Sequence, residues 1–186
     1  MLAYGAGEAG AFDTLYARHK GGVYRYILRQ CRNAGIADEL FQDVWMSAIR
    51  VRASYAPTAR FTTWIYTLAH NRIVDHWRAS GQMKVASIDD DENGDARDIV
   101  ESIPAAANDE PEVRVLSGEL GAQLREALDA LPQEQRETFL LQYEGGLSLA
   151  EIAQVTGVGT ETVKSRLRYA TGKLRSALGG VRESWK

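Results

Sequence analysis

Basic and hydroxyl side chains gather in one stretch of the chain, SLAEIAQVTGVGTETVKSRL, which spans residues 148–167. Ser148 suits the N-cap of a helix over residues 149–156, and Glu151, three residues later, completes a capping box. Gly157 ends that helix and permits a tight turn, after which Thr160 caps a second, longer helix. Two helices joined in this way are typical of a motif that reads DNA.

The longer of these helices has two distinct faces. One face is an apolar stripe, which predicts burial of this side against the rest of a domain: Val163, Leu167, Ala170, Leu174 and Ala177. The opposite face is polar and basic: Glu161, Lys164, Ser165, Arg168, Thr171 and Arg175, with Arg166 and Lys173 beside it. A row of exposed donors on a helix can contact base edges in the major groove. A helical hairpin whose charged face is merely solvated is the alternative.

The overall charge conflicts with simple DNA binding. The chain has 22 basic and 25 acidic residues and a formal net charge of −3, whereas a protein that holds DNA by phosphate neutralisation alone should be basic. Ten acidic residues but only one basic residue lie between Asp89 and Glu112. Much of the acid is therefore separate from the motif, in a segment with little capacity to bury a core, which predicts a flexible linker.

A second group of chemically capable residues lies in FTTWIYTLAHNRIVDHWR, residues 61–78. Trp64, Asn71 and Asp75 are separated by seven and four residues, so they share one face of a helix. An amide can pair with a base edge as donor and as acceptor. Aromatic rings are more often core than ligands, and we expect Ile65, Leu68 and Ile73 to be core.

Apolar periodicity predicts helices throughout the chain outside the acidic segment. Residues 12–78 divide into three helices, of which the second covers about 37–50 and the third about 62–78, after a break at Pro57. Pro132 suits the first turn of another helix, which a Gly-Gly pair ends. We predict an all-α fold of two small helical domains, 1–80 and 117–180, joined by an acidic linker at 81–116 and followed by a tail at 181–186.

Several other classes of protein fit this sequence poorly. His70 and His76 are six residues apart, which does not make a same-face ligand pair, and Cys31 has no nearby partner. No Gly-rich phosphate loop or nucleophile motif occurs, so we expect neither an enzyme nor a bound cofactor or metal. The chain has no apolar run long enough to span a bilayer and no signal peptide, which predicts a cytoplasmic protein without membrane insertion.

Three segments, in order, resemble an extracytoplasmic-function (ECF) sigma factor of the sigma-70 family, and the likeness covers roughly residues 10–180. ADELFQDVWMSAIR resembles the family's region 2.2, and FTTWIYTLAHNRIVDHWR resembles regions 2.3 and 2.4. The segment from LREALDALPQEQRETFLL to TVKSRLRYATGKLR resembles region 4. The resemblance implies a factor that binds core RNA polymerase, directs it to −10 and −35 promoter elements and assists promoter melting.

The resemblance also assigns partners and site residues. It implies docking on the β′ clamp and β flap of core RNA polymerase, with an acidic helix face on the clamp: Asp38, Glu39, Gln42 and Asp43. It implies −10 contacts and melting by Trp64, Tyr66, Asn71, Arg72, His76 and Arg78, with the loop YAPTARF beside a flipped base. It implies −35 contacts by Thr160, Glu161, Lys164, Ser165, Arg166 and Arg168. An anti-sigma factor is a further implied partner.

This sequence departs from the family where many members have SRLxRAR, because SRLRYAT places Tyr169 and Thr171 at positions that are usually arginine. The departure weakens any transfer of a promoter sequence. The resemblance resolves the charge conflict, since the polymerase supplies most of the electrostatic grip on DNA. A helix-turn-helix regulator with a helical sensing or dimerisation domain is the alternative, and it should shift promoter DNA without polymerase.

Overall fold

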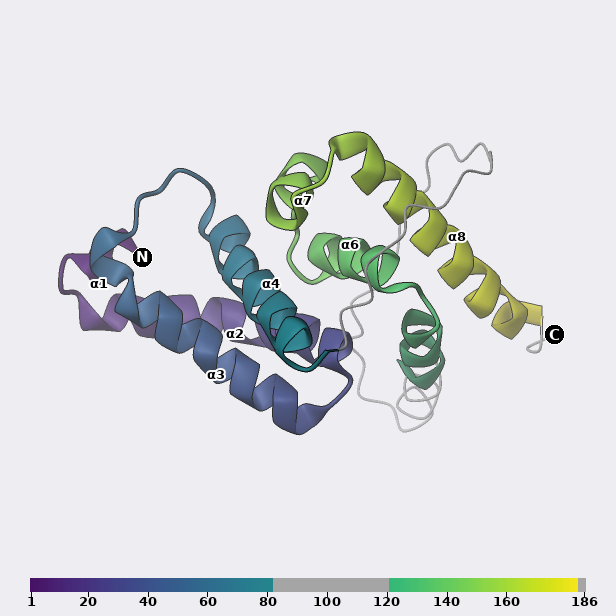
Figure 1. The fold of residues 1–186 in the computed structure, drawn as a ribbon, viewed down its shortest axis with the longest axis horizontal. Helices are drawn as coiled ribbons and strands as arrows, with labels where there is room; N and C mark the ends of the chain where they lie inside the picture. The colour runs from purple at the N-terminus through teal and green to yellow at the C-terminus, as the bar shows by residue number, and fades with distance from the viewer. Residues whose placement is uncertain (82–120, 184–186) are drawn as a thin grey trace.

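The computed structural model describes residues 1–81 and 121–183, and within those residues every regular element is helical. The first part holds α1 (Leu2–Gly5), α2 (Ala9–Cys31), α3 (Ala34–Arg50), a 3₁₀ turn (Arg52–Ser54) and α4 (Phe61–Ala79). The second holds a helical stretch over 121–129, α6 (Gln133–Tyr143), α7 (Leu149–Thr156) and α8 (Thr160–Glu183) (Figure 1). The predicted all-α class is confirmed. Most of the predicted linker, 82–116, lies outside the described residues.

The N-terminal part, residues 1–81, is a bundle in which α2, α3 and α4 pack on one another (Figure 1). Its innermost side chains are fully buried aliphatic and aromatic residues: Val23, Tyr26, Ile27, Val44, Ile65 and Ile73. The predictions for Ile65 and Ile73 are confirmed, whereas Leu68 is half-buried and packs against the edge of this core. A second layer of rings surrounds Trp45, which makes edge contacts with Phe12 and Tyr16 at centroid distances of 5.8 and 5.0 Å. We call this bundle the N-terminal domain.

A sharp turn joins α2 to α3. Arg32 ends α2 in the left-handed conformation, with φ of 56°, and its backbone N–H donates to the carbonyl of Leu28. Asn33 then caps α3, because its side-chain oxygen accepts from the N–H of Ile36 at 3.1 Å. The apolar pattern predicts a start at about residue 37, and the structure corrects it to Ala34, because the Asn33 cap begins the helix one turn earlier.

The C-terminal part, residues 121–183, packs α6, α7 and α8 around buried leucine, isoleucine and valine side chains: Leu140, Leu141, Leu147, Ile152, Val163 and Leu174. We call it the C-terminal domain. The predicted stripe of α8 is buried at Val163, Ala170 and Leu174, but the prediction for Ala177 is wrong, because that residue is exposed. A straight helix drifts by about 40° over two heptads, which moves Ala177 to the edge of the stripe.

The capping box predicted for α7 is present. The hydroxyl of Ser148 accepts from the N–H of Glu151, and the Glu151 carboxylate accepts from the N–H of Ser148 at 2.9 Å. Gly157 ends the helix with φ of 70°, as the sequence predicts. Thr160 is the first residue of α8 rather than its cap, because the N–H of Val163 donates to the carbonyl of Gly159 at 3.1 Å.

The two domains pack directly against each other, a feature that the sequence analysis did not predict. Helix α4 lies against α7, and α2 lies against α6 (Figure 1). The approach is close at Gly22 of α2, where a Cβ atom would lie 2.8 Å from the Tyr66 hydroxyl and 3.0 Å from the carbonyl of Glu144 in the other domain. We refer to this packing of the domains as the closed arrangement.

Three glutamates of the C-terminal domain hold side chains of the N-terminal domain. Buried Glu137 accepts from the Tyr26 hydroxyl at 2.9 Å, and the same oxygen lies 2.6 Å from Nδ1 of His70. Glu151 accepts from the Thr63 hydroxyl at 2.7 Å, so one carboxylate both caps α7 and joins α7 to α4. Glu144 pairs with Arg25, with 2.7 Å between the nitrogen and the oxygen.

Candidate nucleic-acid interface

The first half of α8 presents the donors that the sequence analysis singled out. Thr160, Glu161, Lys164 and Arg168 are exposed, whereas Ser165 and Arg166 are half-buried. Lys164 pairs with Glu161 at 2.7 Å, within the helix, and Arg168 lies over the ring of Tyr169 at 5.0 Å from its centroid. Because Lys164 and Arg168 are one turn apart on the exposed face, their cationic groups can reach neighbouring phosphates or base edges.

Two hydroxyl side chains of the predicted polar face, Ser165 and Thr171, are less available for DNA contact than the sequence implies. The Ser165 hydroxyl donates to the carbonyl of Thr162 at 3.0 Å, which is a bond within its own helix. Thr171 is half-buried, while Lys173 and Arg175 are exposed further along α8. The basic face therefore extends about two turns beyond Arg168, the last residue assigned to the −35 element.

On α4, Asn71 is exposed and Trp64 is half-buried, two helical turns apart on the same face. The Trp64 ring makes an edge contact with Tyr55 at a centroid distance of 5.0 Å and lies 5.6 Å from Phe61. Tyr55 belongs to the loop that precedes α4, so this contact fixes the loop beside the face that carries Asn71. The arrangement puts an aromatic surface beside one exposed loop and an exposed amide two turns further along the same face of α4.

Tyr66 does not share that surface. It is 2 % exposed and packs edge-on against Tyr26 at a centroid distance of 5.3 Å. Two residues along a helix correspond to a turn of about 200°, so Tyr66 points to the side opposite Trp64. Burial raises the pKa of its hydroxyl, and the nearby Glu144 carboxylate adds to this effect. Part of this burial comes from the C-terminal domain, since a Cβ at Gly145 would lie 3.3 Å from the Tyr66 ring. The assignment of Tyr66 to DNA contact therefore stays a prediction, and it requires the two domains to separate.

The remaining −10 candidates lie along the C-terminal half of α4. Arg72 is half-buried and donates to the Ser47 hydroxyl at 3.0 Å, which ties α4 to α3. His76 is half-buried, and Arg78 is exposed and lies 3.8 Å from Asp75. Arg78 is therefore the most accessible cation of this group, whereas Arg72 has a packing contact as well.

The acidic face on α3 is as exposed as the sequence predicts. Asp38, Glu39, Gln42 and Asp43 are all exposed. A hydrogen bond from the Tyr24 hydroxyl to Asp38 raises the pKa of Tyr24, and burial adds to the shift. Met46 lies one turn beyond Gln42 and Asp43 and is 49 % exposed. Sequence reasoning missed Met46, although its helical spacing from Gln42 places it on the same face.

Comparison with known proteins decides the family. Residues 15–82 match Sigma-70 region 2 and residues 121–174 match Sigma-70 region 4. The chain is 31 % identical over 174 residues to the ECF RNA polymerase sigma factor SigK of Mycobacterium ulcerans, covering 92 % of this chain and 88 % of the relative. It is 30 % identical over 174 residues to the RNA polymerase sigma factor CarQ of Myxococcus xanthus, covering 93 % and 92 %.

This chain belongs to the ECF sigma factors of the sigma-70 family. As a member it binds RNA polymerase and directs promoter-specific initiation of transcription, and the family consists of initiation factors rather than enzymes. The region 2 match also decides against the conventional regulator that the sequence left open. We call the N-terminal domain region 2 and the C-terminal domain region 4.

Two solved structures have the same fold. The sigma factor RpoE in complex with the anti-sigma factor NepR from Bartonella quintana aligns with a TM-score of 0.65 at 20 % identity, over 91 % of this chain and 97 % of that chain. CnrH in complex with the cytosolic domain of CnrY aligns with a TM-score of 0.64 at 21 % identity, over 96 % of both chains. Among the described helices of this sigma factor, none is long and apolar enough to cross a bilayer.

Proposed function

We propose that region 2 of this sigma factor reads the −10 element and assists melting through α4. The supporting observation is the face that joins the half-buried Trp64 ring, the exposed Asn71 amide and the loop fixed by Tyr55. The amide pairs with the edge of an extruded base, and the indole stacks beside it. Arg72, His76 and Arg78 contact the neighbouring backbone, and Tyr66 can take part only once region 4 has moved away from it.

Region 4 reads the −35 element with the N-terminal half of α8. Lys164 and Arg168 make the main contacts because both are exposed and lie on one face. Thr160, Glu161, Ser165 and Arg166 surround them. Binding the DNA requires Lys164 to exchange its bond with Glu161 for a phosphate or a base, at little cost since that pair is solvent-exposed.

Core RNA polymerase binds through the acidic face of α3, which docks on the β′ clamp, while region 4 docks on the β flap. Asp38, Glu39 and Asp43 supply charge that steers the encounter with a basic surface, and Met46 supplies apolar contact area within the same face. This work takes place in the cytoplasm, where the polymerase acts. The chain needs no cofactor for it.

An anti-sigma factor is the regulatory partner that we propose. Its support is the likeness in fold to RpoE and CnrH, whose structures hold NepR and the cytosolic domain of CnrY. The likeness extends over more than nine-tenths of this chain, so it includes both regions.

The two regions separate when the factor engages a promoter. By their names the −10 and −35 elements lie about 25 base pairs apart, which is roughly 85 Å of DNA at 3.4 Å per base pair. In the closed arrangement α7, which leads into α8, packs on α4. Reading surfaces on adjacent helices do not span that length of DNA, so the closed arrangement is a resting form.

Run-off transcription with purified core polymerase tests these roles. We expect Asn71→Ala to reduce open-complex formation at least tenfold while polymerase binding is retained, since the amide acts only on the DNA. We expect Asp43→Arg to weaken polymerase binding itself, because it reverses one charge of the docking face. Gln123→Ala, on the exposed side of the stretch 121–129, is the control. Normal transcription by both variants would contradict the assigned roles.

A further inference from the structure

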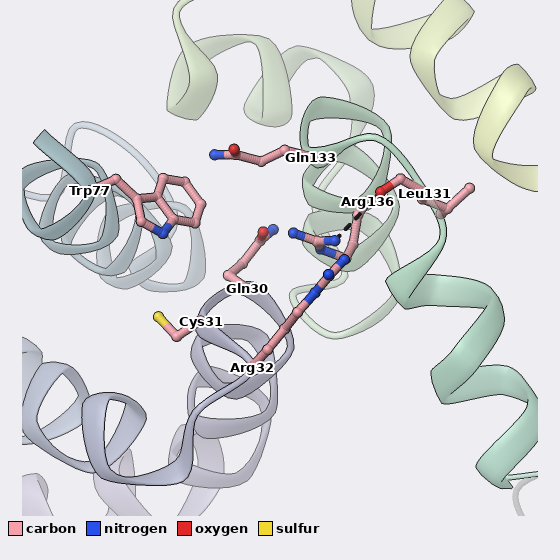
Figure 2. Close-up of a pocket in the computed structure, with 7 residues that line it drawn as sticks. All are labelled: Gln30, Cys31, Arg32, Trp77, Leu131, Gln133 and Arg136. Atoms are coloured by element: carbon pink, nitrogen blue, oxygen red, sulfur yellow. Dashed lines mark hydrogen bonds between the residues drawn. The ribbon is translucent and has the colours of Figure 1, made fainter. Parts of the chain in front are cut away.

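A cavity of about 300 Å³ lies between the two regions. The end of α2, the end of α4 and the start of α6 surround it (Figure 2). Its lining is mostly polar and includes two arginines: Gln30, Cys31, Arg32, Trp77, Leu131, Gln133 and Arg136. Because both regions contribute side chains, this cavity exists only while they are packed together.

Two buried side chains of the cavity have polar atoms without a partner. Gln30 is 3 % exposed, and neither its amide oxygen nor its amide nitrogen has a hydrogen bond to any described residue. Arg136 is 5 % exposed, and its Nε is likewise without a described partner. Figure 2 shows the Gln30 amide and the Arg136 guanidinium pointing toward each other in the cavity. Buried polar groups in native proteins are nearly always satisfied, so these atoms indicate a missing partner.

The missing partner should be negatively charged. None of the ion pairs found among the described residues involves Arg136, although a buried cation requires a counter-charge. The two carboxylates whose charges act on Arg136 are already engaged, Asp129 by Arg32 and Glu137 by Tyr26 and His70. Arg136 donates only a long bond of 3.5 Å to the Leu131 carbonyl.

Two further features add positive potential to the cavity. Arg32 reaches in from α2, and its only described acidic partner is Asp129, at 3.2 Å, whose main-chain carbonyl also accepts from Arg32. Helix α6 starts beside the cavity after Pro132 without a side-chain cap, so its first N–H groups are free for an anion. These features strengthen the case made by the unpartnered side chains.

We propose that this cavity binds a small oxyanion of the phosphate or carboxylate class and that the bound anion holds the closed arrangement. The guanidinium groups of Arg136 and Arg32 and the amide N–H of Gln30 donate to it, since guanidinium forks match the oxygens of phosphate and carboxylate. Gln30 and Arg32 belong to region 2 and Arg136 to region 4, so the anion bridges both regions. The volume admits a small organic anion against the Trp77 ring.

The rate at which Cys31 is alkylated can report anion binding, because Cys31 lines the cavity and is the chain's single cysteine. Burial raises the pKa of its thiol to about 11, so alkylation is slow while the regions stay closed. We would follow its labelling in the full chain, with inorganic phosphate or acetate added at constant ionic strength against chloride. At an anion concentration ten times the dissociation constant, we expect labelling to slow about tenfold and to saturate.

Gln30→Met and Arg32→Gln are the test variants, and Arg18→Gln, an exposed arginine on α2, is the matched control. Gln30→Met removes an unpartnered buried amide at similar volume, so without anion we expect no loss in thermal midpoint. Both variants should lose the protection by anion, whereas the control keeps it. If phosphate alone slows the labelling of Cys31, the site binds anions of the phosphate class. If acetate slows it equally, the site binds carboxylates.

Two results would overturn this inference. One is an equal rate of Cys31 labelling in phosphate, acetate and chloride, which would mean that water molecules satisfy the polar atoms of Gln30 and Arg136. The other is unchanged protection in Gln30→Met and Arg32→Gln, which would mean a general salt effect on stability. The assay contains neither polymerase nor promoter, so its outcome is independent of the promoter contacts proposed above.

Discussion

The carboxylate of Glu137 on α6 lies 2.6 Å from Nδ1 of His70 on α4, and this contact crosses from region 4 to region 2. Glu137 is 7 % exposed, and the same oxygen accepts from the buried Tyr26 hydroxyl. Burial, together with the Glu137 charge, raises the pKa of Tyr26 well above its ordinary value, so its hydroxyl stays a donor at neutral pH. One carboxylate therefore satisfies two polar groups that closure buries.

Glu137→Ala should open the closed arrangement. The substitution leaves Tyr26 and His70 unpartnered in the closed form, which costs about 1–3 kcal/mol, whereas both groups reach water once the regions separate. We expect the open population to rise roughly five- to 150-fold. Faster labelling of Cys31 and a larger radius of gyration in X-ray scattering would report it. Glu126→Ala, an exposed carboxylate in the same region, is the control, and equal labelling of both variants would contradict the prediction.

The Glu151 carboxylate should make the free energy of unfolding depend on pH in the acidic range. Hydrogen bonds from the Ser148 backbone, then from Thr63 and the Ser148 hydroxyl, together with the positive charge of Arg60, lower the pKa of this carboxyl despite its partial burial. A lowered folded-state pKa means that the stabilisation is complete above the ordinary value of 4.5 and is lost as pH falls through the lowered value.

Glu151→Gln tests that dependence. At neutral pH we expect the variant to be about 1 kcal/mol less stable, the usual size of a helix-cap effect. The difference should shrink as the pH falls below 4.5, since the wild-type carboxylate is then protonated as well. Urea unfolding midpoints over a pH series measure it, with Glu126→Gln as the control. A difference that is constant with pH would mean that the carboxylate charge is not involved.

Substitutions at Trp64 and Tyr66 should have different effects, although the two residues are close together on one helix. One should impair promoter melting and the other should lower the stability of the fold. Tyr66→Ala removes a ring that is 2 % exposed and should cost about 3–5 kcal/mol of unfolding free energy. Trp64→Ala removes a half-buried ring at the proposed melting face, so it should cost less stability but impair open-complex formation on duplex promoters. A promoter with a pre-melted −10 region should restore its activity, and failure of that rescue would mean that Trp64 only packs the loop.

Much of this fold follows from local sequence signals. The Ser148 and Glu151 capping box, the Gly157 turn and the Val163, Ala170 and Leu174 stripe are set by neighbours within a few residues, and the structure contains them all. The family likeness marks a segment, whereas the burial of Tyr66 is decided by helix phase and by the packing of region 4 against it. Trp64 and Tyr66 lie in the same segment but on opposite sides of α4.

The packing of the two regions could not be predicted from the sequence. Glu137 and Glu144 resemble solvated helix residues when viewed alone, and Glu151 resembles a local helix cap. Their partners in region 2 lie 67 to 119 residues away along the chain. No periodicity connects such distant positions. The unpartnered amide of Gln30 is visible only when three helix ends have been brought together.

Gly22 gives the most direct test of whether closure restrains this sigma factor. A Cβ at this position would lie 3.0 Å from the Glu144 carbonyl in region 4, and backbone there does not move aside cheaply. The Tyr66 hydroxyl, at 2.8 Å, is the far end of a side chain and adjusts more easily. Within α2 itself, alanine is a better helix former than glycine by about 1 kcal/mol, so region 2 keeps its fold.

Gly22→Ala should therefore push the regions apart without unfolding either one. Gly21→Ala is a matched control on the same helix, since a Cβ there meets only the Arg25 side chain, at 3.2 Å. We expect Gly22→Ala to label faster at Cys31 and to give more transcript at limiting polymerase, while Gly21→Ala matches the wild type. If Gly22→Ala labels faster at Cys31 but gives no more transcript, closure does not compete with polymerase binding. The free energy needed to open the wild-type protein would then be too small to limit initiation.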